Sequence, residues 1–188
     1  MKQEIIEVVQ DYLKEFPLEK QRLTILENYL KKFDDDEIVD WNNVSGHITV
    51  GAFVYCQKKD MWLALYHKDL KMYLYPGGHV DKDDKNLIMA TLRELEEETD
   101  LKDLTLFDLK PIDIDVHLIP FNERVGMPEH YHFDFRYIFL IKDIDEVVLD
   151  KNELRDYRWI LSSELSMNAN FEKVIKKFQI FTKNRMSD

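Results

Sequence analysis

A pair of glycines followed by a cluster of glutamates is the part of this 188-residue sequence whose residue types most clearly suggest chemistry. Gly77 and Gly78 precede a short acidic loop, and Glu94, Glu97 and Glu98 follow it within a predicted helix. The glutamates stand at positions i, i+3 and i+4, so their carboxylates share one helix face and repel one another. A divalent cation would turn this repulsion into a site, and clustered oxygen ligands favour Mg²⁺ or Mn²⁺ over Zn²⁺.

The glycines have a physical role in this prediction. Without side chains, their backbone can approach a bound metal closely, and we expect Gly77 to lend a carbonyl oxygen as a further ligand. The alternatives are a plain turn at the glycines and a solvated helix face at the glutamates. Taken alone, such a run of glutamates is more often a solvated helix face. Its spacing from the glycines resembles that of a known family, and this resemblance favours a metal site formed by Gly77, Glu94, Glu97 and Glu98.

Residues 78–101 resemble the signature of the Nudix hydrolases, in which a glycine and a loop precede Arg-Glu-apolar-X-Glu-Glu-X-Gly-apolar. Here Arg-Glu-Leu-Glu-Glu-Glu-Thr-Asp-Leu closes the motif at residues 93–101. The loop at 81–86 is one residue longer than the family spacing, and Asp84 best matches the first acidic residue. Asp100 replaces the closing glycine. Because Asp tolerates the positive φ that Gly adopts there, we expect the helix to end in the same way.

The resemblance implies an activity and a role for each residue. Cleaving a phosphoanhydride requires neutralised phosphate oxygens and an activated water, and bound Mg²⁺ can provide both. We therefore expect a metal-dependent hydrolase that cleaves a diphosphate bond in a nucleoside-diphosphate-linked or similar small phosphorylated metabolite. By resemblance, Glu94 and Glu98 are the core ligands, Glu97 shares them, one glutamate serves as general base, and Arg93 orients the carboxylates.

Two other functions stay open at this point. One is an isomerase of the isopentenyl-diphosphate kind, which would share the fold. The resemblance implies that such an isomerase needs a reactive cysteine beside a glycine–histidine loop. The single cysteine, Cys56, lies instead in an apolar predicted strand. A non-catalytic metabolite-binding module is the other alternative, and the intact trio of glutamates argues against it.

Two further predicted strands carry polar residues at every second position. Asp113, Asp115 and His117 lie on one face of the first strand, and the second presents His130, His132, Asp134 and Arg136. If the strands pair antiparallel through the 120–129 loop, these faces adjoin. Because aspartate is depleted in strands, we predict that this patch flanks the cleft and binds a phosphate or leaving group. An exposed face with cross-strand ion pairs and a zinc site are the alternatives.

His79, just after the glycines, is another candidate for binding a phosphate, and a local hydrogen bond is the alternative for it. The substrate-binding residues predicted from the sequence are therefore His79, His117, His130, His132, Asp134 and Arg136.

Composition narrows the class of partner. The chain is 45% hydrophobic with a formal net charge of −11, so it can form a packed core but lacks the basic surface that nucleic-acid binding requires. No apolar run is long enough to span a membrane, and the charged N-terminus does not resemble a secretion signal. One cysteine allows no internal disulfide. We expect a cytoplasmic protein that binds a small phosphorylated molecule, and a homodimer is possible.

Hydrophobic periodicity predicts helices at 1–16 and 18–33, separated at Pro17, followed by an acidic linker at 34–37. Residues 1–40 would form an N-terminal helical hairpin, and 45–182 a catalytic domain. That domain alternates strands with a helix at 86–99 and another at 171–181. This order predicts an α+β fold, an α/β/α sandwich with a mixed, mostly antiparallel sheet, and it resembles the Nudix fold.

Overall fold

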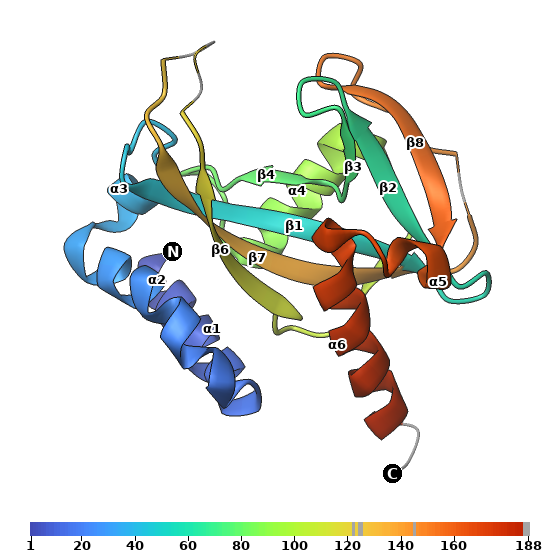
Figure 1. Ribbon diagram of the computed structural model, residues 1–188, viewed down its shortest axis with the longest axis horizontal. Helices are drawn as coiled ribbons and strands as arrows, with labels where there is room; N and C mark the ends of the chain where they lie inside the picture. Colours follow the sequence, from blue (N-terminus) through green and yellow to red (C-terminus); the bar gives the residue numbers. More distant parts are fainter. Residues whose placement is uncertain (122, 124–125, 145, 186–188) are drawn as a thin grey trace.

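The computed structural model describes residues 1–121, 123, 126–144 and 146–185 (Figure 1). Its helices are α1 (Lys2–Glu15), the 3-10 helix η1 (Pro17–Glu19), α2 (Lys20–Lys32), α3 (Asp35–Ile38), α4 (Leu87–Thr99), α5 (Ser162–Leu165) and α6 (Ala169–Arg185). Its strands are β1 (Gly46–Cys56), β2 (Met61–His67), β3 (Met72–Leu74), β4 (Gly77–His79), β5 (Leu104–Leu106), β6 (Asp113–Ile119), β7 (His130–Ile141) and β8 (Leu154–Leu161). None of the described helices is long and apolar enough to cross a membrane.

The strands form one eight-stranded sheet in which β1 and β7 are the central pair. These two strands run parallel, from Gly46 opposite Tyr131 to Cys56 opposite Ile141. Every other pairing is antiparallel: β1 with β2 and β4, β2 with β3 and β8, and β7 with β5 and β6. The prediction of a mixed, mostly antiparallel sheet is confirmed.

Residue alternation along β1 and β7 assigns the helices to two layers, one on each face of the sheet (Figure 1). On one face, Val50 and Phe135 share a core with α1, α2 and α4. On the other face, Phe53 and Ile138 pack against α6 through apolar residues such as Phe171. The helices therefore enclose the sheet as the outer layers of the predicted α/β/α sandwich.

The N-terminal helices pack directly on the sheet. Ile5 and Leu23 belong to the same buried cluster as Phe133, and the Tyr29 hydroxyl donates a hydrogen bond of 2.5 Å to the carbonyl of Gly46. The acidic segment at 34–37, predicted as a linker, instead begins the short helix α3. Asp34 caps it, accepting hydrogen bonds from two backbone amides of the first turn. The division into segments 1–40 and 45–182 stays a prediction.

Candidate active site

The glycine pair lies in the short strand β4, and not in the plain turn considered as an alternative. Gly78 pairs with Val50 of β1, and Gly77 pairs with Gly51. Gly77 has a φ of +156°, and a Cβ there would lie 2.2 Å from the carbonyl oxygen of Val50. A Cβ on Gly78 would lie 2.6 Å from Oε2 of Glu94. Both positions therefore exclude side chains, the first because of backbone and the second because of a carboxylate.

Helix α4 brings the glutamates against these glycines. Asn86 caps its first turn by accepting a hydrogen bond of 2.8 Å from the amide of Met89, and Leu87 and Leu95 anchor its apolar face in the core. Asp100 ends the helix in the left-handed region with a φ of 54°, so the expected substitute for glycine is confirmed. The opposite face of α4 then presents Glu94 and Glu98 to β4.

Arg93 braces this arrangement from the side. Its guanidinium donates two hydrogen bonds to Asp84, of 3.1 and 2.8 Å, and a third of 2.9 Å to Glu94. It also donates to the carbonyl of His79 at 2.9 Å and to Glu97 at 3.3 Å. Asp84, the residue matched to the first acidic position of the signature, therefore pairs with Arg93 despite the longer loop.

Burial disfavours the ionised forms of Glu94 and Glu98 and raises the pKa of both carboxyl groups. The backbone amide of Gly77 donates a hydrogen bond of 2.9 Å to Glu98, yet burial, together with the charge of Glu94, raises the pKa of Glu98 to about 8. Burial also raises the pKa of Glu94, against the opposing effect of Arg93. Glu97 differs, since 60% of its side chain is exposed. A cation bound beside Glu94 and Glu98 would therefore favour their ionised forms.

A cleft of about 370 Å³ opens over these groups. Its lining residues are Val39, Trp41, Gly77, Gly78, His79, Asp81, Arg93, Glu94, Glu97, Glu98, Asp150 and Glu153.

Four of the lining residues, Val39, Trp41, Asp150 and Glu153, lie outside the segment that the sequence assigned to the site. Asp150 and Glu153 lie just before β8, and Val39 and Trp41 follow α3. The chain at 148–150 is fastened to the end of α4, because the amides of Val148 and Asp150 donate hydrogen bonds to the carbonyls of Thr99 and Glu98. Because these hydrogen bonds join segments about 50 residues apart, no local sequence pattern predicts them.

The predicted pairing of the two polar strands is confirmed, but it leads away from this cleft. β6 and β7 pair antiparallel, with Asp113 opposite Arg136, Asp115 opposite Asp134, and His117 opposite His132. Arg136 donates hydrogen bonds to Asp134 at 2.8 Å, to Asp115 at 3.0 Å and to Asp113 at 3.3 Å. These residues lie on the sheet face that α6 covers.

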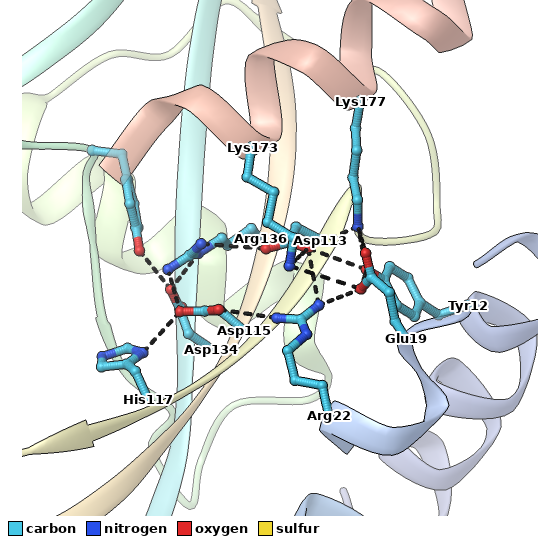
Figure 2. Close-up of polar contacts among 11 residues, drawn as sticks. Tyr12, Glu19, Arg22, Asp113, Asp115, His117, Asp134, Arg136, Lys173 and Lys177 are labelled. Carbon is cyan, nitrogen blue, oxygen red and sulfur yellow. Dashed lines mark hydrogen bonds and ion pairs between the residues drawn. The ribbon is translucent and has the colours of Figure 1, made fainter. Parts of the chain in front are cut away.

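Asp113 is the centre of a buried ion-pair network (Figure 2). Its side chain is fully buried and accepts a hydrogen bond of 2.8 Å from Lys177 of α6. Arg22 of α2 contacts it at 3.3 Å and contacts Asp115 at 2.9 Å. Although burial opposes ionisation, the surrounding cations lower the pKa of Asp113 to about 2. The network joins the helical hairpin, the edge of the sheet and α6.

The structure therefore does not place Asp134 and Arg136 among the residues that line the cleft. Both are buried, and their charges are matched within the protein, with Tyr75 donating a further hydrogen bond of 2.6 Å to Asp134. A substrate phosphate would have to displace these partners. The alternative of cross-strand ion pairs describes them better, although the face is buried where an exposed one was considered.

The histidines predicted to bind substrate lie on the same face of the sheet as Asp134 and Arg136, but they form a separate cluster. His79 lines the cleft, and its Nε2 lies 2.9 Å from Nε2 of His47 in β1. His47 in turn contacts His132, which neighbours His130. Burial, together with the neighbouring histidines, lowers the pKa of His47 to about 3 and that of His132 to about 2. His117 lies beside them, hydrogen-bonded to Asp115 at 3.1 Å.

The cleft's donors fit a hard divalent cation. Glu94 and Glu98 supply oxygen atoms beside a strand that has no side chains at Gly77 and Gly78, and Glu97, Asp150 and Glu153 extend the acidic lining. Mg²⁺ and Mn²⁺ prefer carboxylate, carbonyl and water oxygens. The raised pKa of Glu98 is the response of a buried carboxylate that lacks a nearby positive charge.

Comparison with known proteins agrees with this geometry. A family model described as the NUDIX domain matches residues 46–179. A probable DHNTP pyrophosphohydrolase of Lactococcus lactis subsp. cremoris is 32% identical over 96 residues, which are 51% of this chain and 55% of the relative. The chain thus spans little more than half the length of that relative.

Solved structures share the fold. An Ap4A hydrolase of C. elegans in a binary complex has 17% identity and a TM-score of 0.55, covering 73% of this chain and 98% of that one. The E. coli dihydroneopterin triphosphate pyrophosphohydrolase has 16% identity and a TM-score of 0.55, with 73% and 95% covered. Together with the arrangement of Gly77, Arg93, Glu94 and Glu98, the match of the family model establishes that this chain belongs to the Nudix hydrolase family.

Proposed function

We propose that this protein is a Mg²⁺- or Mn²⁺-dependent pyrophosphohydrolase that cleaves a diphosphate bond in a nucleotide or nucleotide-like small metabolite. The observation that carries this proposal is the convergence of Glu94 and Glu98 on β4, where the pKa of Glu98 is raised to about 8. Membership of the Nudix family and a relative named as a probable pyrophosphohydrolase support it.

Four residues of the cleft have defined physical roles in this function. Glu94 and Glu98 would hold the metal, and the amide of Gly77 keeps one oxygen of Glu98 in place. Arg93, held by Asp84, orients Glu94 and the backbone at His79. When bound, Mg²⁺ neutralises phosphate charge and lowers the pKa of water.

Glu97 is the best candidate for the general base. Its side chain is 60% exposed, so its carboxylate is accessible to solvent, and Arg93 contacts it at 3.3 Å. Proton transfer requires such a group close to the attacking water. Glu94 and Glu98 are less suited to the role because their oxygens face β4 and would be occupied by the metal.

Trp41 suggests the substrate class. Its indole lines the cleft and is 57% exposed, so it offers an aromatic face that the protein does not itself cover. Stacking on such a face is worth about 1–3 kcal/mol per base. A heteroaromatic triphosphate, derived from either a purine nucleoside or a pterin, combines a ring that can stack on Trp41 with phosphates that can bind the metal held by Glu94 and Glu98. The relative named as a DHNTP pyrophosphohydrolase supports the pterin choice.

The isomerase alternative receives no support from the cleft. Cys56 is fully buried at the end of β1 and is absent from the lining residues, so it offers no accessible thiol for chemistry there.

A panel of substrates tests the proposal. Pterin triphosphate, nucleoside triphosphates, dinucleoside polyphosphates, nucleoside diphosphate sugars and prenyl diphosphates would each be incubated with the protein and Mg²⁺, and products followed by ³¹P NMR. The proposal expects pyrophosphate or phosphate release, with the highest kcat/KM for a heteroaromatic triphosphate. Tight binding without turnover across the panel would indicate a binding module instead.

A further inference from the structure

Four histidines form a second cluster of potential metal ligands that the proposed hydrolysis does not use. His47 of β1, His79 of β4, and His130 and His132 of β7 share one face of the sheet, because His47 pairs with His132 and His79 pairs with Thr49. Backbone register alone thus brings together four of the six histidines in the chain. Their positions on three paired strands leave little freedom to separate.

The rings meet through the same atom, Nε2. The Nε2–Nε2 distances are 2.9 Å between His79 and His47, 2.9 Å between His47 and His132, and 3.3 Å between His132 and His130. Two nitrogens bound to one tetrahedral ion at about 2.0–2.1 Å would lie about 3.3 Å apart. The ligand atoms of His47, His130 and His132 all lie within 4.8 Å of one another, and His79 adjoins this group of three through its contact with His47.

Hydrogen bonding among neutral rings cannot satisfy this chain of contacts. Each Nε2 of a neutral imidazole carries either one proton or one lone pair, so it takes part in one such hydrogen bond. Four nitrogens in a row can therefore form two hydrogen bonds, while three close contacts exist. At least one pair of nitrogens is left in contact without a proton between them, which is unfavourable unless a cation replaces the proton.

The contacts of the Nδ1 atoms in two of these rings are also consistent with a cation bound between the Nε2 atoms. Nδ1 of His130 lies 2.7 Å from the carbonyl oxygen of Pro128, which can only accept a hydrogen bond, so the neutral ring keeps its lone pair on Nε2. Metal-bound histidines commonly use the second nitrogen in this way. Nδ1 of His47 is buried without a hydrogen-bond partner among the described residues, so this ring makes its polar contacts through Nε2.

We propose that His47, His130 and His132 bind one divalent transition-metal ion, with Zn²⁺ as the best fit. His79, whose Nε2 contacts that of His47, would complete the ligand set, at a site that adjoins the cleft but does not include the carboxylates of α4. Four imidazoles without a carboxylate suit Zn²⁺, Co²⁺ or Ni²⁺ and disfavour Mg²⁺. A site with four protein ligands is closed, so its role is structural. The ion would tie β4 to β1 and β7, and thereby fix the strand that carries Gly77 and Gly78.

Cobalt titration of tag-free protein tests this site, since a polyhistidine tag would itself bind the metal. Tetrahedral Co²⁺ with nitrogen ligands absorbs strongly in the visible, whereas octahedral Co²⁺ at carboxylates absorbs weakly. We expect one equivalent of strongly absorbing Co²⁺, displaced by Zn²⁺ but not by excess Mg²⁺, and a higher Tm with Zn²⁺ than without metal. A titration with no strong band would overturn the proposal.

Matched variants locate the binding. His130→Gln and His132→Gln should each weaken Co²⁺ binding at least about tenfold, by comparison with the losses typical of partners of metal ligands. His67→Gln replaces a histidine outside the cluster, and Glu98→Gln alters the carboxylate site; both should keep the strong band. Circular dichroism would confirm that each variant is folded. Retention of the band in folded His130→Gln and His132→Gln, or its loss in Glu98→Gln, would contradict the assignment.

Discussion

The backbone amide of Gly77 donates a hydrogen bond of 2.9 Å to Oε2 of Glu98, joining the strand β4 to the acidic face of α4. Burial raises the pKa of this carboxyl group to about 8. Glu98→Gln should therefore lower kcat at least about a hundredfold, because even the partners of metal ligands are worth roughly 10–100-fold. Steady-state kinetics with saturating Mg²⁺ would measure this, and activity within about threefold of wild type would exclude Glu98 as a ligand.

The same carboxylate should make the metal-free protein less stable as pH rises. The folded state keeps a proton on Glu98 up to about pH 8, whereas the unfolded chain releases it near the ordinary pKa of 4.5. The folded state binds more protons over this interval, so the free energy of unfolding falls between about pH 5 and about pH 8. Urea unfolding in EDTA should show the decline in wild type and Glu97→Gln, and a smaller decline in Glu98→Gln. Equal slopes in all three would refute the assignment.

Replacing the two glycines should have different effects, on activity at Gly78 and on stability at Gly77. Gly78→Ala places a methyl group against the flexible carboxylate of Glu94, so we expect a large loss of activity with little change in Tm. Gly77→Ala meets the backbone of Val50 at a strained φ, so it should cost about 1–3 kcal/mol of stability. Thermal unfolding and kinetics on both variants would compare them, and equal losses of stability would contradict this distinction.

Arg93 and Asp84 should act as one unit. Arg93→Lys keeps the charge but loses the paired hydrogen bonds to Asp84, so we expect kcat to fall about tenfold. Asp84→Asn should have a similar effect, and the double variant should be little worse than either single one. Additive losses in this double-mutant cycle would show that the two residues act independently.

Substitutions in the buried ion-pair network of Figure 2 should lower stability without changing catalysis. Removing one charge leaves its partners buried and unmatched, so Arg136→Met or Asp113→Asn should each lower the free energy of unfolding by about 3–5 kcal/mol. KM should stay within about twofold for the folded fraction, since neither residue lines the cleft. A selective rise in KM for Arg136→Met would restore the substrate role expected from the sequence.

Trp41→Ala should raise KM for a heteroaromatic triphosphate about tenfold with kcat nearly unchanged, because stacking contributes about 1–3 kcal/mol to binding. Trp41→Phe retains an aromatic face and should recover much of the loss. An unchanged KM in Trp41→Ala would remove this residue from the substrate site.

Local patterns predicted much of this structure because their cause is local. The spacing of Glu94 and Glu98 along a helix, the left-handed cap at Asp100 and the alternation on β6 and β7 each depend on neighbours a few residues away. The pairing of those two strands followed from one connecting loop.

What the sequence left open depends on contacts between distant segments. Asp113 was assigned to the cleft because nothing local shows that Lys177, in the last helix, neutralises it. Asp150 and Trp41 join the cleft through the packing of segments on either side of α4. The histidine cluster depends on the parallel register of β1 with β7, which sets His47 beside His132.

Hydrolysis in ¹⁸O-labelled water tests the central claim most directly. With Mg²⁺ and the best substrate of the panel, the account predicts that one product carries ¹⁸O on phosphorus, and that EDTA or Glu98→Gln abolishes its formation. Turnover that proceeds unchanged in folded Glu98→Gln, or in EDTA, would contradict hydrolysis by a metal held at this cleft.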